Sequence, residues 1–260
     1  MPKILNLNDF SPLLTSPESK GTSPLTLNGE SFSDGTLNFP LVDGLPILLP
    51  SKVHPYIKNG RIEIPLDKSL EKFIQYFLIS SIKQNHPTIN SDHNDYWYQR
   101  HMDNCKKLFT HAKEGLLLDI GCDTPSLNIK LHSQNIQYIG LDPSFTLTEE
   151  FRVIGIAELL PFKNESFDNV CLMSSLDHVL DYYQAFSEAT RVLKKGGKML
   201  FSILVWYKEA DLFNDTNHFH HFRDEQIMNL FIDYKITFMF KDVWKNNTHR
   251  ESLYLCAEKI

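Results

Sequence analysis

The sequence is poor in several features that would mark particular protein classes. It has 11 glycines in 260 residues, below the usual share of about 7%, so any glycine-rich nucleotide loop is expected to be degenerate. No two of its four cysteines (Cys105, Cys122, Cys171 and Cys256) lie close in sequence. This excludes a C-x-x-C metal motif and favours free thiols. The N-terminus lacks the apolar stretch and the cleavage site of a signal peptide.

Long hydrophobic runs and an excess of positive charge are also missing. The longest apolar stretch, around Phe73–Ile82, is interrupted by polar residues and is shorter than the roughly 20 residues of a membrane-spanning helix. Lys and Arg number 26 against 32 Asp and Glu, a net charge of −6, which argues against broad nucleic-acid binding. We therefore expect a soluble, cytoplasmic protein that does not bind membranes and does not bind nucleic acid broadly, with a local basic patch left open. Its oligomeric state is left open.

Hydrophobic residues make up 42% of the chain, enough for a packed core. In the N-terminal part, short apolar runs such as Pro24–Leu27 and Leu41–Leu49 alternate with turn residues. This pattern predicts a small β-rich module over residues 1–60. Residues 51–66 are expected to act as a linker, because they contain Pro55, Gly60 and Pro65.

Residues 67–260 are predicted to form a larger domain in which strands and helices alternate. Helices are expected over residues 70–82, 96–111, from 127 onward, 181–193 and 224–232. Strands are expected over residues 116–120, 137–141, 152–156, 169–173, 199–205, 235–240 and 252–257. Lys194 to Gly197 are expected to end the helix before them. The alternation indicates a parallel α/β sheet with helices on both faces and ligands at the carboxyl ends of the strands.

Acidic residues and a turn follow the first two strands of this domain. The first strand leads into Asp119-Ile120-Gly121-Cys122-Asp123-Thr124-Pro125-Ser126, and the second ends in Gly140-Leu141-Asp142-Pro143. A turn after the first strand can bring backbone N–H groups to a ligand. An acid at the tip of the second strand can accept hydrogen bonds from both ribose hydroxyls. The arrangement indicates a nucleoside site.

Four segments extend this pattern: LLLDIGC, YIGLDPS, AELLPFKNESFDNV and SSLDHVLDYYQAFSEATRVLKKGGKMLFSI. In this order they resemble the small-molecule branch of the class I S-adenosylmethionine-dependent methyltransferases, over roughly Tyr96–Ile260. The resemblance implies a Rossmann-like, seven-stranded sheet with helices on both faces, preceded here by the small β-rich module. It further implies S-adenosylmethionine as cofactor and methyl transfer to an O or N atom of a small molecule or sugar.

The resemblance also implies which residues contact the cofactor. They are Asp119, Gly121 and Cys122 in the first turn, Asp142 and Pro143 after the second strand, Ala157 and Glu158 after the third, and Ser174 after the fourth. The family usually carries glycine at positions 123 and 125, where this chain has Asp123 and Pro125. Pro125 suits a first helical turn, and Asp tolerates a left-handed backbone better than most residues.

Histidines are the candidates on the acceptor side. In the segment Asp177-His178-Val179, which matches a turn near the transferred methyl group, His178 is a candidate proton acceptor, or a residue that shapes the turn. His220 and His221 within HFHHF are expected to contact substrate, with an ordinary surface loop as the alternative. No carboxylate or thiol lies at ligand spacing from this tract, so no metal site is predicted. Asp177 and Asp181 are interpreted as surface or capping acids.

The N-terminal module has a resemblance of its own. Residues 16–50 resemble the short zinc-ribbon proteins that activate some RNA and protein methyltransferases. The two C-x-x-C pairs of those ribbons correspond to Ser16, Ser19, Ser33 and Thr36. Hydroxyls are poor zinc ligands beside thiolates, so we expect a metal-free, degenerate ribbon, with an ordinary N-terminal loop region as the alternative.

Two other functions stay open. Asp123, Pro125 and the missing zinc ligands are compatible with an inactive pseudo-methyltransferase that acts as a binding or regulatory protein. The ribbon resemblance favours an RNA or protein methyltransferase. Against this, residues 1–60 carry four lysines and five acidic residues. Met173-Ser174-Ser175-Leu176 also replaces the Asn-Pro-Pro-Tyr-type motif expected for a protein acceptor.

Overall fold

The fold is described from a computed structural model of the chain. It describes residues 3–4, 6–58, 61–62, 96–122, 135–144, 152–207, 218–243 and 249–260. The helices expected over residues 70–82 and from residue 127 lie outside these residues, as do Asp123 and Pro125.

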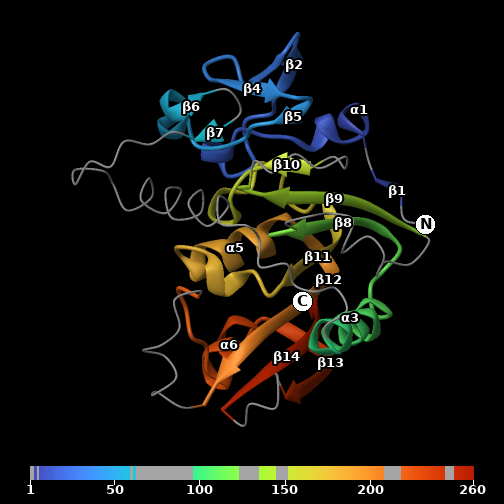
Figure 1. The fold of residues 1–260 in the computed structure, drawn as a ribbon. Helices are drawn as coiled ribbons and strands as arrows, with labels where there is room; N and C mark the ends of the chain where they lie inside the picture. Colours follow the sequence, from blue (N-terminus) through green and yellow to red (C-terminus); the bar gives the residue numbers. More distant parts are fainter. Residues whose placement is uncertain are drawn as a thin grey trace.

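A mixed β-sheet forms the larger part of the structure (Figure 1). Its strands are β8 (Gly115–Ile120), β9 (Ile136–Asp142), β10 (Arg152–Ile154), β11 (Phe167–Met173), β12 (Leu193–Trp206), β13 (Tyr234–Val243) and β14 (Arg250–Lys259). These seven strands follow the order β10-β9-β8-β11-β12-β14-β13, and the short β1 (Lys3–Ile4) also pairs with β9. β14 runs antiparallel to both neighbours, whereas the other pairings are parallel. The predicted α/β fold is confirmed.

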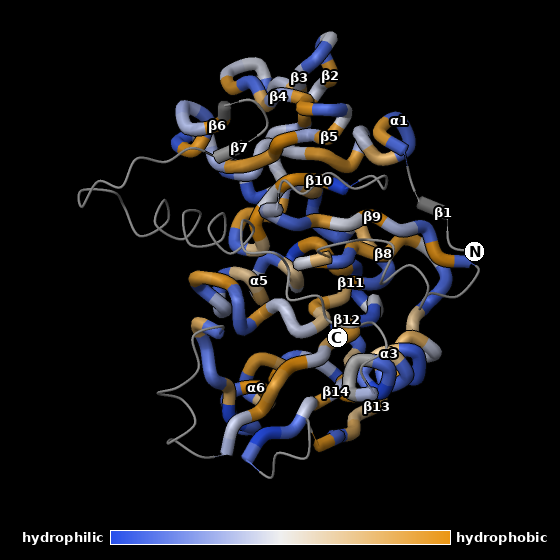
Figure 2. Tube along the Cα trace, in the orientation of Figure 1, coloured by the Kyte–Doolittle hydropathy of each residue, from blue (hydrophilic) through white to orange (hydrophobic). Residues whose placement is uncertain are grey.

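Helices cover both faces of the sheet: α3 (Tyr96–Phe109), α5 (Tyr182–Val192) and α6 (Asp224–Leu230). Leu118 and Ile120 pack in the core formed with α5 and α6, whereas Leu117 packs on the α3 side. Strands buried on both faces contain runs of hydrophobic residues, such as residues 116–118 of β8, which is why the sequence located them. In Figure 2, orange segments of the central strands are interrupted by white and blue ones. Among the described residues, no helix combines the length and apolar composition needed to cross a bilayer.

The N-terminal residues form a small β-rich module, as predicted, drawn in blue beyond β10 in Figure 1. Its antiparallel sheet contains β2 (Thr26–Asn28), β3 (Ser31–Ser33), β4 (Asn38–Val42) and β5 (Leu45–Pro46). Before this sheet come the short helix α1 (Leu7–Phe10) and the 3-10 turns η1 (Ser11–Leu13) and η2 (Pro17–Ser19). The described part of the expected linker instead forms η3 (Ser51–Tyr56) and the hairpin of β6 (Ile57–Lys58) and β7 (Arg61–Ile62), whereas residues 59–60 and 63–66 lie outside the described residues. It stays packed because Val53 is buried against Ile47 and Leu49.

The module joins the large sheet at its β10 edge. The Leu48 N–H donates to the Ile154 carbonyl at 2.8 Å, and the Thr15 N–H donates to the Pro161 carbonyl at 3.0 Å. Phe10 lies in the same hydrophobic core as the strands of the large sheet. The described residues of the two parts therefore share one continuous core.

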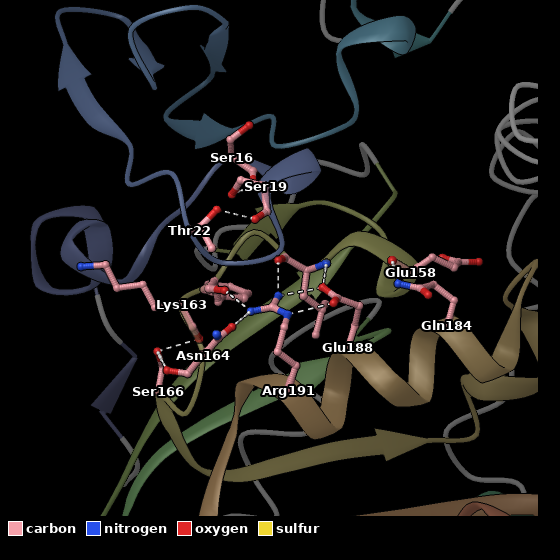
Figure 3. A network of polar contacts seen from close by, with 12 residues as sticks. Ser16, Ser19, Thr22, Glu158, Lys163, Asn164, Ser166, Gln184, Glu188 and Arg191 are labelled. Atoms are coloured by element: carbon pink, nitrogen blue, oxygen red, sulfur yellow. Dashed lines mark hydrogen bonds and ion pairs between the residues drawn. The ribbon is translucent and has the colours of Figure 1, made fainter.

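A guanidinium group ties α5 to the loop beneath the module (Figure 3). Arg191 donates to both carboxylate oxygens of Glu188 at 2.8 and 2.7 Å, and to the carbonyls of Leu160 at 2.9 Å and Phe162 at 2.7 Å. Gly21 of the module lies against this network with φ +84°, and a Cβ there would meet the Arg191 Nη1 at 2.5 Å. The module therefore packs directly on a charged network of the larger part.

The end of α5 differs from the sequence-based expectation. The helix ends at Val192, and Leu193 is already extended and fully buried as the first residue of β12. Lys194 forms an ion pair with Asp168 at 2.8 Å. The helix thus ends within one residue of the expected position, but residues 194–197 extend β12 and do not form a glycine stop.

Candidate active site

The turn after β8 is shaped by Gly121. Its φ of +76° is left-handed, and a Cβ there would lie 2.5 Å from the Cβ of Ser175. The Gly121 N–H donates to the Leu141 carbonyl at 2.8 Å, and the Ser175 hydroxyl donates to the Ile120 carbonyl at 2.8 Å. These bonds hold the carboxyl ends of β8, β9 and β11 together, and only glycine fits the position.

Asp119 lies inside the α3 face of the sheet. It is fully buried, and its carboxylate accepts hydrogen bonds from the Tyr138 hydroxyl at 2.7 Å and the Cys171 thiol at 3.1 Å. Burial and the charge of Asp119 raise the pKa values of Tyr138 and Cys171 well above their usual range. Both groups therefore remain protonated donors, and Asp119 supports the turn from beneath.

Asp142 ends β9, and its carboxylate accepts a hydrogen bond from the Ser144 N–H at 2.8 Å. Arg152 donates to the Ser144 carbonyl at 2.6 Å and so fixes the turn from β10. Pro143, which follows Asp142, is half-buried. Cys122 is buried, and its backbone N–H donates to the Leu141 carbonyl at 3.2 Å. Asp142 is thus held at a strand tip by its own turn.

Ala157 and Glu158 begin the 3-10 turn η4 (Ala157–Leu159), and both are buried. The Glu158 Oε1 accepts hydrogen bonds from the N–H groups of Leu180 at 2.7 Å and Asp181 at 3.3 Å. Its Oε2 is buried and has no hydrogen-bond partner within the described residues. Burial raises the pKa of Glu158, although the backbone hydrogen bonds oppose this. The carboxylate thus supports the loop that leads into α5.

Ser174 follows β11 and is exposed, with a left-handed φ of +52°. Its N–H donates to the Ser202 carbonyl at 2.9 Å, and the two hydroxyl groups lie 3.3 Å apart. Ser174 therefore presents a polar side chain at the carboxyl end of the sheet, beside β12. Asp181 caps α5 by accepting the Gln184 N–H at 3.0 Å, which confirms its predicted capping role.

Asp177 is not a surface or capping acid, as the sequence had indicated. It lies in the 3-10 turn η5 (Leu176–His178) and is 1% exposed. Its carbonyl accepts hydrogen bonds from the N–H groups of Phe219 at 2.8 Å and His220 at 3.2 Å, which draws the HFHHF segment against η5. Its carboxylate lies beside His178 and His218, at 3.8 and 3.7 Å. This neighbour of the histidine tract is distant in sequence and was therefore missed.

The two histidines predicted to contact substrate are half-buried. The His220 Nε2 lies 2.8 Å from the Val179 carbonyl, and its ring meets Tyr182 edge-on at 4.9 Å. His221 meets the Trp206 indole edge-on at 4.8 Å. His220 therefore fastens the segment to the residues after η5, and substrate contact by either histidine stays a prediction.

Hydrogen bonds close the turns at the positions that correspond to zinc ligands. The Ser19 hydroxyl donates to the Ser16 carbonyl at 2.6 Å, and the Ser33 hydroxyl donates to the Leu37 carbonyl at 3.0 Å. The Thr36 N–H donates to Asp34 at 2.9 Å. These bonds supply local closure of both turns, and the relation to zinc ribbons stays a prediction.

Comparison with known proteins points to one family over part of the chain. Residues 118–201 match a family described as a methyltransferase domain. An uncharacterised protein of Methanocaldococcus jannaschii is 32% identical over 123 residues, which is 44% of this chain and 52% of that protein. A demethylmenaquinone methyltransferase of Staphylococcus haemolyticus is 32% identical over 105 residues, 35% of this chain and 44% of that protein. The chain thus spans about half the length of the curated relatives it matches.

Among solved structures, an S-adenosylmethionine-dependent methyltransferase of Thermotoga maritima superposes with a TM-score of 0.51 at 23% identity, over 63% of this chain and 91% of that one. This likeness shows the fold. The matched residues 118–201 contain the Gly121 turn, Asp142 and η5. Over this part, the chain therefore matches a methyltransferase domain in sequence, within the fold of S-adenosylmethionine-dependent methyltransferases.

Proposed function

We propose that the chain transfers a methyl group from S-adenosylmethionine to an oxygen or nitrogen atom of a small molecule or sugar. One observation carries the proposal. The Gly121 turn and Asp142 follow neighbouring parallel strands, in which Ile120 is paired with Leu141, inside the segment that matches a methyltransferase domain. Ligands of such sheets bind where these strand ends meet.

The residues at these strand ends suit an adenosyl ligand. Asp142 offers a carboxylate at a strand tip, where it can accept hydrogen bonds from ribose hydroxyls. Gly121 leaves no side chain between the strand ends, and Ala157 provides a small surface for adenine. Asp119 acts on the ligand indirectly, because Tyr138 and Cys171 donate to its carboxylate. Ser174, directly after β11, would line the floor of the cofactor site below the sulfonium.

When bound, S-adenosylmethionine supplies a methyl group on a positively charged sulfur. The bound cofactor would give this methyl group to the acceptor atom and leave as a neutral thioether. The proton of the acceptor leaves to a base or to water. The chain contributes alignment and exclusion of water. His178, whose side chain is 44% exposed beside buried Asp177, is the candidate base.

Isothermal titration with S-adenosylmethionine and S-adenosylhomocysteine tests the proposal. We expect saturable binding to the wild type and about 10- to 100-fold weaker binding to Asp142→Asn, because charged hydrogen bonds to the ribose are lost. The asparagine can still accept the Ser144 N–H, so the turn should persist. Asp103→Asn, at an exposed acid of α3 paired with Lys106, is the matched control. A folded chain that binds neither ligand refutes methyl transfer and leaves a non-enzymatic scaffold.

Transfer itself is measured by incubating the chain with S-adenosylmethionine and a panel of small alcohols, phenols, amines and sugars. Production of S-adenosylhomocysteine that depends on the acceptor identifies the accepting group. Methylation of RNA or protein fractions alone would instead favour a macromolecular acceptor.

A further inference from the structure

Two histidines face one buried carboxylate beyond the carboxyl ends of β11 and β12. The Asp177 Oδ1 lies 3.8 Å from the His178 Nε2, and the Asp177 Oδ2 lies 3.7 Å from the His218 Nε2. All three donor atoms lie within 4.8 Å of one another. Asp177 and His178 belong to η5, whereas His218 follows β12, so the fold brings the group together from two distant segments.

One oxygen of the buried Asp177 carboxylate receives no hydrogen bond from the residues that the structure describes. The side chain is 2% exposed, and this oxygen is Oδ1. The separations of 3.7 and 3.8 Å from the two imidazoles exceed hydrogen-bond length. Burial of such a group is costly unless a cation compensates it.

The segment that supplies His218 is anchored. Its next two residues, Phe219 and His220, donate backbone hydrogen bonds to the Asp177 carbonyl. Further along, the Trp206 N–H donates to the Phe222 carbonyl at 2.9 Å, and the Trp206 indole meets the His218 ring edge-on at 5.8 Å. His218 is therefore held opposite Asp177 by the backbone and by an aromatic contact, as a preorganised ligand would be.

We propose that Asp177, His178 and His218 form a binding site for a divalent transition-metal ion, with Zn²⁺ as the expected ion. Tetrahedral zinc places neighbouring donors about 3.3 Å apart, so donors within 4.8 Å of one another reach that geometry with shifts of under about 1 Å each. Two imidazoles and a carboxylate suit transition metals rather than Mg²⁺ or Ca²⁺. Three protein ligands leave a fourth position for water or substrate.

Metal binding stands independently of the proposed function, whereas a catalytic use of the metal rests on it. The site lies at the same edge of the sheet as Asp142 and the Gly121 turn. A hydroxyl acceptor bound at the fourth position would lose its proton to water more readily, because a metal ion lowers the pKa of a bound hydroxyl. The site therefore favours alcohols or phenols as acceptors. In this arrangement His178 holds the metal and does not take the proton.

The first test is a titration of the full chain with Zn²⁺ in the absence of S-adenosylmethionine. The protein is purified without a histidine tag and treated with a chelator beforehand. We expect one ion per chain, and about 100-fold or greater loss of affinity in Asp177→Asn and in His218→Ala, since even residues that only orient ligands cost 10- to 100-fold. His111→Gln, at a half-buried histidine that stacks on Phe238 of β13, is the matched control and should retain the affinity.

The absorption spectrum of the Co²⁺-loaded protein gives a second readout. We expect visible bands in the wild type and in His111→Gln, and their loss in His178→Gln, a change at a half-exposed residue that should leave the fold intact. Circular dichroism checks the fold of every variant. Absence of saturable binding, or unchanged binding after His218→Ala, overturns the proposal and identifies the group as an ion pair. Zinc binding without any binding of S-adenosylmethionine would refute only the methyl transfer.

Discussion

Replacement of Arg191 tests the charged network on which the N-terminal module packs. The Arg191→Ala chain loses the guanidinium that pairs with Glu188, whose side chain is only 4% exposed. It also leaves the carbonyls of Leu160 and Phe162 without this donor. Removing one partner of a buried ion pair costs about 3–5 kcal/mol. For a chain of this size, this corresponds to a fall of about 6–20 °C in Tm.

The assay is urea unfolding of wild type and variants, followed by both tryptophan fluorescence and circular dichroism. Arg191→Lys keeps the positive charge but loses the planar guanidinium, so its free energy of unfolding should lie between those of the wild type and Arg191→Ala. In Glu188→Gln with Arg191→Met, no buried charge is left unpaired, so this double variant should be more stable than Arg191→Met alone. A loss of less than about 1 kcal/mol in the free energy of unfolding of Arg191→Ala would refute the reasoning, because an ion pair on the exposed surface contributes no more than this.

Three further predictions concern backbone and pH. Gly21→Ala should lower the free energy of unfolding by about 1–3 kcal/mol, because φ at Gly21 is +84° and the new Cβ would meet the Arg191 Nη1 at 2.5 Å. The measurement is urea unfolding, with Gly29→Ala as the matched control, since Gly29 also has a positive φ but lies in open space. Burial lowers the pKa of His101 to about 4, so on acidification the unfolded chain takes up a proton before the folded chain does. The free energy of unfolding should therefore fall by about 3 kcal/mol as the pH drops from about 6.5 toward 4. An unchanged pH dependence of that free energy in His101→Gln would contradict this. Burial raises the pKa of Glu158, so the contribution of its protonated form to stability should decline as the pH rises above 4.5, the ordinary pKa of a glutamate side chain. Thermal unfolding across pH 4–8 should show a smaller decline in Glu158→Gln than in the wild type.

Much of the sheet could be predicted because its strands are buried on both faces. The apolar runs at residues 116–120 and 169–173 lie within β8 and β11. The turn at Gly121 and the acid at Asp142 were likewise visible, since each directly follows such a run. Sequence could not show that the Asp119 carboxylate points into the α3 side, because that depends on Tyr138 and Cys171 from two other strands.

Contacts between distant segments account for what the sequence did not predict. Asp177 seemed an ordinary polar residue, and its burial follows from the return of Phe219 and His220 onto its carbonyl. The expected linker, likewise, looked flexible from its prolines and glycine, yet Val53 is buried in a cluster completed by Ile154 of β10. Neither contact leaves a local pattern, since each partner belongs to a different part of the chain.

The attachment of the N-terminal module to β10 has a consequence for biosynthesis. Leu14 pairs with Phe162, a residue that a ribosome adds roughly 150 positions later, which at 5–20 residues per second takes about 7–30 s. During this interval Phe10, Phe32 and Phe39 have left the ribosome without the strands that complete their core. The nascent chain therefore carries exposed aromatic residues for many seconds, and these are the kind of surface that chaperones bind.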